Sequence, residues 1–173
     1  MGPVGSGKSE QTKRLAARLK IDTISTSQLL RDNLTPQLEA KMLAGDLVDD
    51  VEIIELLKPV LKDKKASEAD FILDGFPRSI PQAEWLVNQI KTGQVRLKAV
   101  IKLDVSDKAV LARLLARGRA DDTQGIIGHR LSVYHQTTDP IIKYLRSHKI
   151  PVYEIAGEQP PDVIQTEINR IIG

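Results

Sequence analysis

The chain has 173 residues, of which 41% are hydrophobic and 28% charged, and its formal net charge is +2. This balance is typical of one globular domain, and the small charge argues against nucleic-acid binding. Because cysteine is absent, a disulfide framework and a thiolate zinc site are excluded, and the histidines do not cluster as metal ligands. No secretion signal and no apolar run of roughly 18 residues is found, so we expect a cytoplasmic protein without a membrane partner.

The first feature along the chain is a glycine-rich loop followed by a predicted helix over 8–19. Gly2, Gly7, Lys8 and Ser9 have the spacing G-x-x-x-x-G-K-[ST] of a phosphate-binding loop. Such a loop points backbone N–H groups at an anion, and the helix adds its positive N-terminal end. We predict that Lys8 reaches the phosphates of a nucleotide and that the Ser9 hydroxyl is a ligand of Mg²⁺.

Strand-like and helix-like segments alternate along the rest of the chain. Short apolar, β-branched runs predict buried parallel strands at 21–25, 70–74, 97–105 and 150–157. Helical patterns lie between and after them, at 49–63, 80–91, 107–117, 123–147 and 161–172. This alternation predicts an α/β fold with a parallel sheet flanked by helices. The stretch 25–48 predicts short helices without a strand, either a mobile cover over a site or a plain helical crossover.

A second chemical motif, DGFPR at 74–78, follows the end of a predicted strand. A carboxylate in the position of Asp74, beside a phosphate loop, is placed to hold the water ligands of a Mg²⁺ ion. Arg78 on the adjacent turn is suited to phosphate oxygens, because its guanidinium is planar and forked. A surface turn with a solvated arginine is the alternative interpretation.

A third segment is rich in arginine and contains two neighbouring carboxylates. Its members are Arg113, Arg117, Arg119, Arg130, Asp121 and Asp122. Arginine is preferred where planar, bidentate phosphate contacts are needed, and the two aspartates are close enough in sequence to orient the guanidinium groups. Solvated arginines are also common on helices, so this segment does not identify a site by itself.

Six segments, in order along the chain, resemble the adenylate kinase family of nucleoside monophosphate kinases. They are GPVGSGKSEQ at 2–11, ISTSQLLR at 24–31, AGDLVDD at 44–50, LDGFPRSIPQAE at 73–84, RLLARGRADD at 113–122 and HRLSVYHQTTDPII at 129–142. The resemblance covers essentially the whole chain and implies a single, monomeric P-loop kinase domain over 1–173. It also implies a monophosphate-binding insertion at 25–48, a very short lid at 118–122, and transfer of the γ-phosphoryl group of Mg-ATP to AMP, giving two ADP.

The resemblance further implies which residues bind the substrates, ATP and AMP. For ATP they are Gly5, Ser6, Gly7, Lys8, Ser9, Glu10, Arg117 and Gln159. For AMP they are Thr26, Arg31, Asp46, Leu47, Val48, Gly75, Phe76, Pro77, Arg78, Gln82, Arg119 and Arg130. The implied catalytic residues are Lys8, Arg78, Arg117, Arg119 and Arg130, and the implied cofactor is Mg²⁺ bound with ATP, near Ser9 and, through water, Asp74. Because the acceptor oxygen is already anionic, the reaction needs positioning and charge neutralisation rather than a general base.

Two residues bear on the choice of the acceptor nucleotide. The amide of Gln82 offers both a donor and an acceptor to an adenine edge, and the pyrimidine-specific members of the family usually carry Asn there. Thr26 also matches the adenylate pattern, where the pyrimidine enzymes tend to carry Ala. We therefore predict AMP as the acceptor. A UMP- or CMP-directed kinase and a degenerate nucleotide-binding scaffold with little turnover are the alternatives.

The chain departs from the family pattern at several positions. Glu10 stands where Thr is usual, and a carboxylate there would repel a bound phosphate. Ser27 and Gln28 replace Gly-Asp, which removes a carboxylate that helps to organise the waters of Mg²⁺. The lid is shorter than the family's short lids. Gly125 and Gly128 occupy helix positions, and each costs about 1 kcal/mol relative to Ala.

The largest departure lies before the phosphate loop, where the family has the central strand of its sheet and this chain has only Met1. We expect this first strand to be missing or truncated, leaving two interior strand edges unpaired and a channel through the core. The lost burial of about four or five aliphatic side chains, at roughly 1.5–3 kcal/mol each, would be comparable with the net stability of a domain. Our hypothesis is that the natural protein starts several residues earlier.

Overall fold

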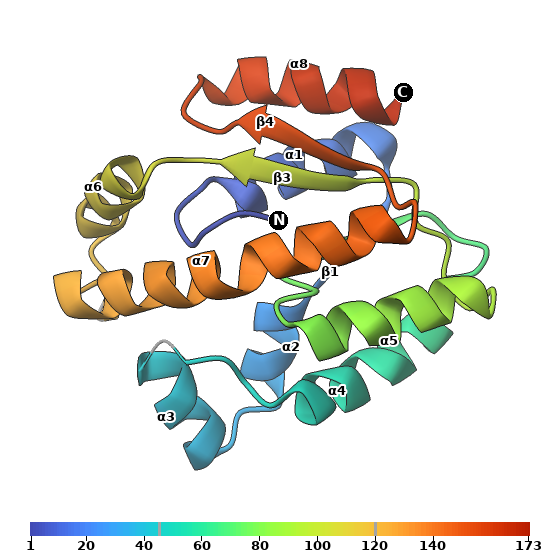
Figure 1. Ribbon diagram of the computed structural model, residues 1–173, viewed down its shortest axis with the longest axis horizontal. Helices are drawn as coiled ribbons and strands as arrows, with labels where there is room; N and C mark the ends of the chain where they lie inside the picture. Colours follow the sequence, from blue (N-terminus) through green and yellow to red (C-terminus); the bar gives the residue numbers. More distant parts are fainter. Residues whose placement is uncertain (45, 120) are drawn as a thin grey trace.

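The computed structural model describes residues 1–44, 46–119 and 121–173, which form layered helices and parallel strands (Figure 1). The elements, in chain order, are α1 (Lys8–Leu19), β1 (Asp22–Ser25), α2 (Thr26–Asp32), α3 (Pro36–Ala44), α4 (Asp50–Asp63), β2 (Phe71–Asp74), α5 (Ile80–Lys91), β3 (Val100–Asp104), α6 (Asp107–Arg117), α7 (Gln124–Ser147), β4 (Val152–Ala156) and α8 (Pro161–Ile172). The α/β fold predicted from the alternating patterns is therefore confirmed. None of the helices in the described ranges is both long and apolar enough to span a bilayer.

Capping side chains at the helix N-termini explain why the observed helix boundaries lie close to those predicted from the sequence. Ser79, Ser106 and Thr123 each accept a hydrogen bond from the backbone N–H three residues later, at the starts of α5, α6 and α7. Asp49 caps α4 by accepting from the N–H of Val51 at 2.9 Å. At the other end of α6, Gly118 adopts the left-handed conformation with φ 66°, which commonly ends a helix. The predicted boundaries of α1, α5, α6 and α8 coincide with the observed ones.

The strands of the described residues form two separate two-stranded parallel sheets. In one sheet β1 pairs with β2, with Asp22 opposite Phe71. In the other sheet β3 pairs with β4, with Val100 opposite Val152. No strand of the described residues joins β2 to β3. The expectation of a sheet that lacks its central strand is therefore confirmed for the chain as given.

Met1 occupies part of the gap between the two sheets, at the centre of the molecule beneath β3 (Figure 1). Its amino group donates to the carbonyl of Ile101, and its own carbonyl accepts from the N–H of Leu103 at 2.9 Å. This is the bonding pattern of one residue in a parallel strand. Burial lowers the pKa of the Met1 amino group from 8.0 to about 5. The gap opens into a cavity of about 1190 Å³ that both β2 and β3 line.

The segment predicted as an insertion begins with Ser25, the last residue of β1, and contains two short helices. It forms α2 and α3, and its buried Leu30 and Leu38 pack in the same hydrophobic cluster as Leu57 of α4 and Phe76. Residue 45 lies outside the described part of this segment. The predicted lid at 118–122 connects α6 to α7, and residue 120 likewise lies outside the described part.

Candidate functional site

The phosphate loop leads directly into α1, as the sequence predicts. Gly7, with φ 93°, is the N-cap residue, and helical bonding begins with the N–H groups of Glu10 and Gln11 donating to its carbonyl at 3.1 Å. The N–H groups of Lys8 and Ser9 precede this bonding and are available to an anion. Gly5 has φ 75°, and a Cβ there would lie 2.9 Å from the side chain of Leu114, so the close approach of loop and helix α6 requires glycine.

Lys8 lies under the loop that it belongs to. Its Nζ donates to the carbonyls of Gly2 and Pro3, both at 2.7 Å. Burial, together with the smaller effect of nearby Arg78, lowers the pKa of Lys8 from 10.5 to about 8, and Asp74 opposes both effects. A phosphate group at the loop would bring negative charge to this ammonium and would favour its protonated form.

Two oxygen ligands of the kind that Mg²⁺ prefers face each other across the loop. The Ser9 hydroxyl donates to a carboxylate oxygen of Asp74 at 3.2 Å. Asp74 is the last residue of β2, and its carboxylate therefore lies at the carboxyl end of a parallel strand. A hydroxyl and a carboxylate fit a hard cation that keeps most of its ligands as water and phosphate oxygens. The described residues hold no group of three or more metal-binding side chains.

The turn after β2 brings three of the predicted AMP residues together. Thr26 donates its hydroxyl proton to the carbonyl of Asp74 at 3.3 Å, and Arg78 Nε donates to the carbonyl of Gly75 at 2.9 Å. Gly75 has φ 88°, and a Cβ there would lie 2.5 Å from the Thr26 hydroxyl oxygen. Burial lowers the pKa of Arg78, with Asp74 opposing this effect.

Gln82, on the first turn of α5, is buried with 4% of its surface exposed and bonds to two groups of the protein. Its Oε1 accepts from the backbone N–H of Arg78 at 2.7 Å. Its Nε2 donates to a carboxylate oxygen of Asp50 at 2.8 Å, and the hydroxyl of Ser79 donates to the same oxygen at 2.6 Å. The amide of Gln82 is therefore held in one orientation.

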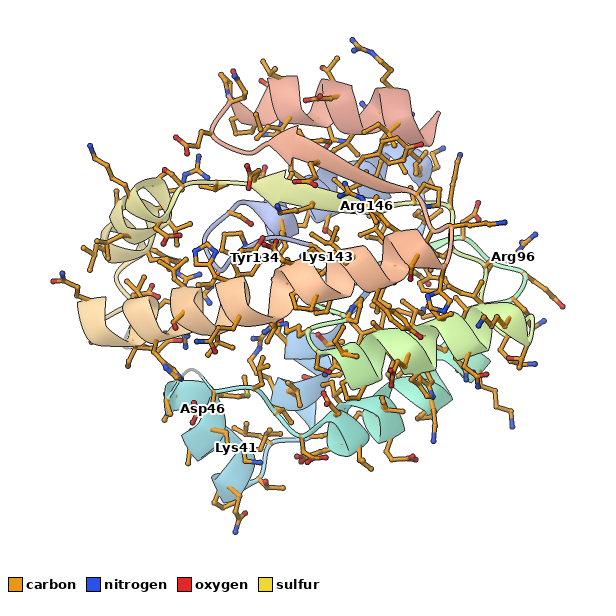
Figure 2. The ribbon with its side chains drawn as sticks, in the orientation of Figure 1. Lys41, Asp46, Arg96, Tyr134, Lys143 and Arg146 are labelled. Carbon is orange, nitrogen blue, oxygen red and sulfur yellow. The ribbon has the colours of Figure 1, made fainter. Side chains whose placement is uncertain are left out.

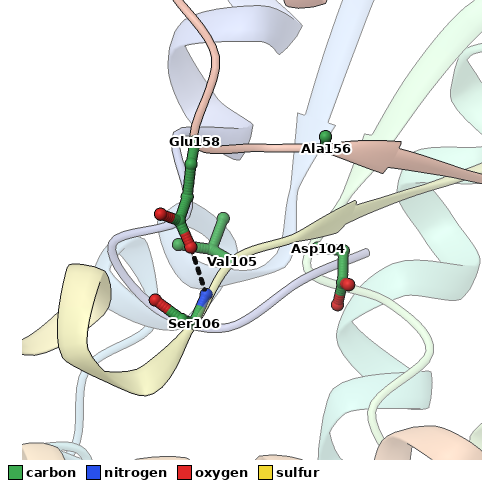
Figure 3. Close-up of a pocket in the computed structure, with 5 residues that line it drawn as sticks. All are labelled: Asp104, Val105, Ser106, Ala156 and Glu158. Atoms are coloured by element: carbon green, nitrogen blue, oxygen red, sulfur yellow. Dashed lines mark hydrogen bonds between the residues drawn. The ribbon is translucent and has the colours of Figure 1, made fainter.

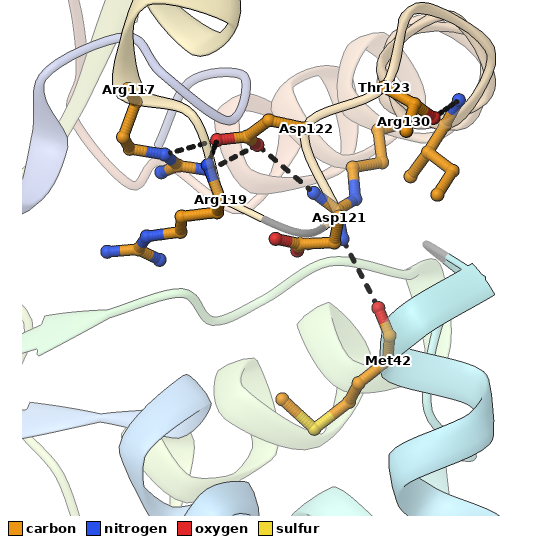
Figure 4. A network of polar contacts seen from close by, with 8 residues as sticks. Met42, Arg117, Arg119, Asp121, Asp122, Thr123 and Arg130 are labelled. Atoms are coloured by element: carbon orange, nitrogen blue, oxygen red, sulfur yellow. Dashed lines mark hydrogen bonds and ion pairs between the residues drawn. The ribbon is translucent and has the colours of Figure 1, made fainter.

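Two of the four arginines of the third segment, Arg117 and Arg130, pair with the two aspartates (Figure 4). Arg117 forms a bidentate pair with Asp122, at 2.8 and 2.6 Å, and Arg130 donates to Asp121 at 2.7 Å. The hydrogen bond from Arg117 lowers the pKa of Asp122. The guanidinium of Arg119 extends away from Asp122 (Figure 4), whose carboxylate accepts instead from the backbone N–H of Arg119 at 3.2 Å.

Arg113 lies apart from these pairs and donates to the carbonyl of Gly157 at 3.1 Å. That contact ties α6 to the turn after β4 and is a structural role.

The insertion contacts the first turns of α7 at two points. Asp46 lies just after α3 (Figure 2) and is 2.8 Å from the Nε2 atom of His129. Arg130 donates to the carbonyl of Met42 at 3.2 Å (Figure 4). The insertion and the residues next to the predicted lid therefore meet over the cavity.

The large cavity collects almost all of the predicted site residues. Both loop glycines Gly5 and Gly7, the cations and the AMP residues line it, whereas Ser6 is buried beside the loop and Gln159 lies elsewhere. Gln159 follows Glu158, which lines a separate cavity of about 350 Å³ between the ends of β3 and β4 (Figure 3). The Glu158 carboxylate accepts there from the backbone N–H of Ser106 at 2.8 Å.

Two of the departures from the family pattern have partners within the protein. Glu10 accepts from Arg14 at 2.7 Å, and Arg14 also pairs with Asp162 of α8, so the Glu10 carboxylate is paired with a cation. Gln28 accepts from Arg31 at 2.9 Å and donates to Asp32 at 2.7 Å. Sequence reasoning missed these contacts. The i, i+4 spacing of an acid and an arginine is the signal that could have shown the first one.

The phosphate loop and the converging cations, placed at the carboxyl ends of parallel strands, define a P-loop protein built to hold phosphate groups. The family model described as adenylate kinase matches residues 1–150. Adenylate kinase 1 of Nostoc sp. is 37% identical over 179 aligned residues, covering 100% of this chain and 96% of the relative. Adenylate kinase of Mycolicibacterium smegmatis is 41% identical over 152 residues, covering 84% and 83%. The chain belongs to the adenylate kinase family.

Proposed function

We infer that the chain transfers the γ-phosphoryl group of Mg-ATP to AMP and produces two molecules of ADP. The observation that carries this conclusion is that one cavity is lined by the phosphate loop and by all five of the cationic side chains that the resemblance makes catalytic. These cations are Lys8, Arg78, Arg117, Arg119 and Arg130. Such a set suits the transfer of phosphoryl between two anionic partners, which requires neutralised charge and in-line positioning.

The ATP side of the site rests on the loop and on Lys8. The N–H groups at the start of α1 bind the β-phosphate, and Lys8 moves its ammonium from the carbonyls of Gly2 and Pro3 towards the β- and γ-phosphates. Ser9 and Asp74 lie where Mg²⁺ would be held, directly and through water. When bound with ATP, this ion neutralises charge on the phosphates. Gln159 is assigned to the adenine of ATP by the resemblance alone.

The AMP side rests on the turn after β2 and on the insertion. Arg78 and Arg31 bind the acceptor phosphate, and Thr26, Gln82 and the backbone at 46–48 hold the nucleoside. Arg119 and Arg130 line the same cavity and neutralise the transferred group. Closure of the insertion 25–48 and of the lid 118–122 keeps water from accepting the phosphoryl group.

We further propose that the chain works as a monomer in the cytoplasm, with ATP and AMP as its small-molecule partners. Both substrate halves are lined by residues of one chain, so a second copy is not needed to complete the site. Sedimentation velocity at micromolar concentration checks the oligomeric state.

Single substitutions test the assignment of the cations. We expect Lys8→Ala and Arg78→Ala each to lower the rate of ADP formation from ATP and AMP by at least about a hundredfold. Lys13→Ala and Arg18→Ala are matched controls, because both residues are exposed on α1 and neither lines the cavity. Thermal melts of all four variants separate lost chemistry from lost folding.

Two outcomes would contradict this assignment. Unchanged turnover in the folded Lys8→Ala variant would remove the phosphate loop from the reaction. ATP binding without ADP formation by the unsubstituted chain would favour the nucleotide-binding scaffold instead. Repeating the assay with UMP, CMP and GMP defines the acceptor.

A further inference from the structure

We propose that Asp50 determines which base the acceptor nucleotide carries, because it fixes the orientation of the Gln82 amide. Asp50 is the first residue of α4 and lies 32 residues before Gln82 in the chain. It belongs to none of the substrate contacts assigned above. The proposal rests on the proposed function, since it concerns the base of the acceptor.

The two protein partners of Gln82 leave its amide only one favourable orientation. A carboxylate can only accept, so the amide group that faces Asp50 must be the NH₂ group. A backbone N–H can only donate, so the group that faces Arg78 must be the carbonyl oxygen. Turning the amide over would place oxygen against carboxylate and NH₂ against N–H. Both hydrogen bonds would be lost at a side chain that is 4% exposed, where unpaired polar groups are costly.

Asp50 is itself held in place. The hydroxyl of Ser79, the N-cap residue of α5, donates to the same carboxylate oxygen that Gln82 contacts, at 2.6 Å. The neighbouring Asp49 caps α4, so the backbone at Asp50 is fixed as well. The Asp50 carboxylate is therefore positioned by contacts at the starts of both α4 and α5.

A fixed amide discriminates between bases by their hydrogen-bonding polarity. Gln82 retains one N–H and one oxygen lone pair beyond its two protein contacts. Adenine offers an acceptor at N1 and a donor at N6, which match these groups. Hypoxanthine has the same shape but presents a donor at N1 and an acceptor at O6, so it would need the reversed amide. The same rule groups cytosine with adenine, and uracil and guanine with hypoxanthine.

The test compares AMP with inosine monophosphate (IMP), which differ mainly in this polarity. We expect the unsubstituted chain to prefer AMP strongly in kcat/KM, and Asp50→Asn to lower the AMP-to-IMP ratio by about tenfold or more. Asparagine keeps the shape but can donate to a reversed amide as well as accept. Asp49→Asn makes the same chemical change one residue away, keeps a good N-cap, and is expected to leave the ratio unchanged.

The ratio separates positioning from folding, because a merely weakened structure lowers both activities together. An equal loss with AMP and IMP in Asp50→Asn, or no preference in the unsubstituted chain, would overturn the proposal. The affinities for AMP and IMP, measured by calorimetry, give the same ratio without turnover. Thus, if the chain binds AMP but forms no ADP, the proposed function is contradicted, and a lowered AMP-to-IMP affinity ratio in Asp50→Asn still supports the role of Asp50. Failure to bind AMP would overturn both.

Discussion

The cationic side chains of the site are bound to acceptors of the protein itself. Lys8 bonds to two loop carbonyls, Arg117 to Asp122, and Arg130 to Asp121. These contacts give the cations hydrogen-bond partners while no phosphate is bound. Binding of a nucleotide must therefore exchange one set of partners for another.

The lowered pKa of Lys8 predicts that ATP binding takes up a proton at alkaline pH. With a pKa of about 8, Lys8 is mostly neutral at pH 8.5, and a bound polyphosphate restores its charge. We expect an uptake of roughly 0.7 proton at pH 8.5 and close to none at pH 6.5. Calorimetry in buffers with different ionisation enthalpies measures this uptake, which Lys8→Met should abolish.

The same shift has a consequence for stability without nucleotide. Because the folded pKa of Lys8 lies below its ordinary value of 10.5, the unfolded chain binds more protons between pH 8 and 10.5. The contribution of Lys8 to the free energy of unfolding therefore rises with pH across that window. Urea titrations measure the free energy of unfolding of the unsubstituted chain and of Lys8→Met. The value for the unsubstituted chain minus that for the variant should rise from pH 8 to 10.5, and a constant difference would contradict the assignment.

Arg14 is expected to matter for ATP binding although it does not touch the phosphate loop. It pairs with the Glu10 carboxylate from one turn further along α1, which offsets the repulsion between that carboxylate and a bound phosphate. Arg14→Ala should raise KM for ATP about two- to fivefold, and adding Glu10→Gln should restore it. Lys13→Ala serves as the control for loss of a neighbouring charge, and failure of the double variant to recover would exclude this explanation.

Helix α7 contains two residues of weak helix propensity. Gly125 and Gly128 lie in its first turns, and an added Cβ would meet nothing within 4 Å at either position. The helix nevertheless forms, because Thr123 caps it and buried residues such as Ile127 and Leu131 anchor its inner face. Tertiary packing therefore outweighs the weak helix propensity of this segment.

Replacing one of these glycines should stabilise the protein. Gly128→Ala is expected to raise the free energy of unfolding by about 1 kcal/mol and the melting temperature by about 2–4 °C. Gly118→Ala is the matched contrast, because its φ of 66° at the end of α6 disfavours a side chain although space is available. That variant should lose about 1–2 kcal/mol. Equal effects of the two substitutions would rule out this account of the backbone.

Sequence reasoning located the elements well because their signals are local. Helix α6 begins after its cap Ser106 and ends before Gly118, and the apolar run at 70–74 contains β2. The phosphate loop could be identified from the spacing of its glycines, lysine and serine alone. The contact of Asp50 with Gln82 was not, since it depends on how α4 packs beside α5. The pairing of Arg130 with the carbonyl of Met42, 88 residues away, was hidden for the same reason.

For the molecule as a whole, the gap between β2 and β3 is the main structural departure. The two sheets share the large cavity and are held together by the helices around them rather than by a continuous ladder. The phosphate loop leaves from this gap, since Met1 bonds to Ile101 and Leu103. The contacts that Met1 makes at the edge of the gap therefore also help to order the phosphate loop.

Amide hydrogen exchange should report this gap directly. The N–H of Val100 donates to the carbonyl of Pro151 at 2.8 Å, on the β4 side of the strand. Because bonding sides alternate along a strand, the N–H of Ile101 points into the gap. We expect Ile101 to exchange much faster than Val100, by at least about tenfold. Equal protection at both positions would contradict the open gap.

The central claim is phosphoryl transfer between two nucleotides, and the product balance of the unsubstituted chain tests it most directly. With equimolar ATP and AMP and excess Mg²⁺, phosphorus NMR should show two ADP formed for each ATP consumed, no inorganic phosphate, and the reverse reaction from ADP alone. ATP loss that does not depend on AMP and releases inorganic phosphate, or no ADP from a folded chain, would contradict the claim.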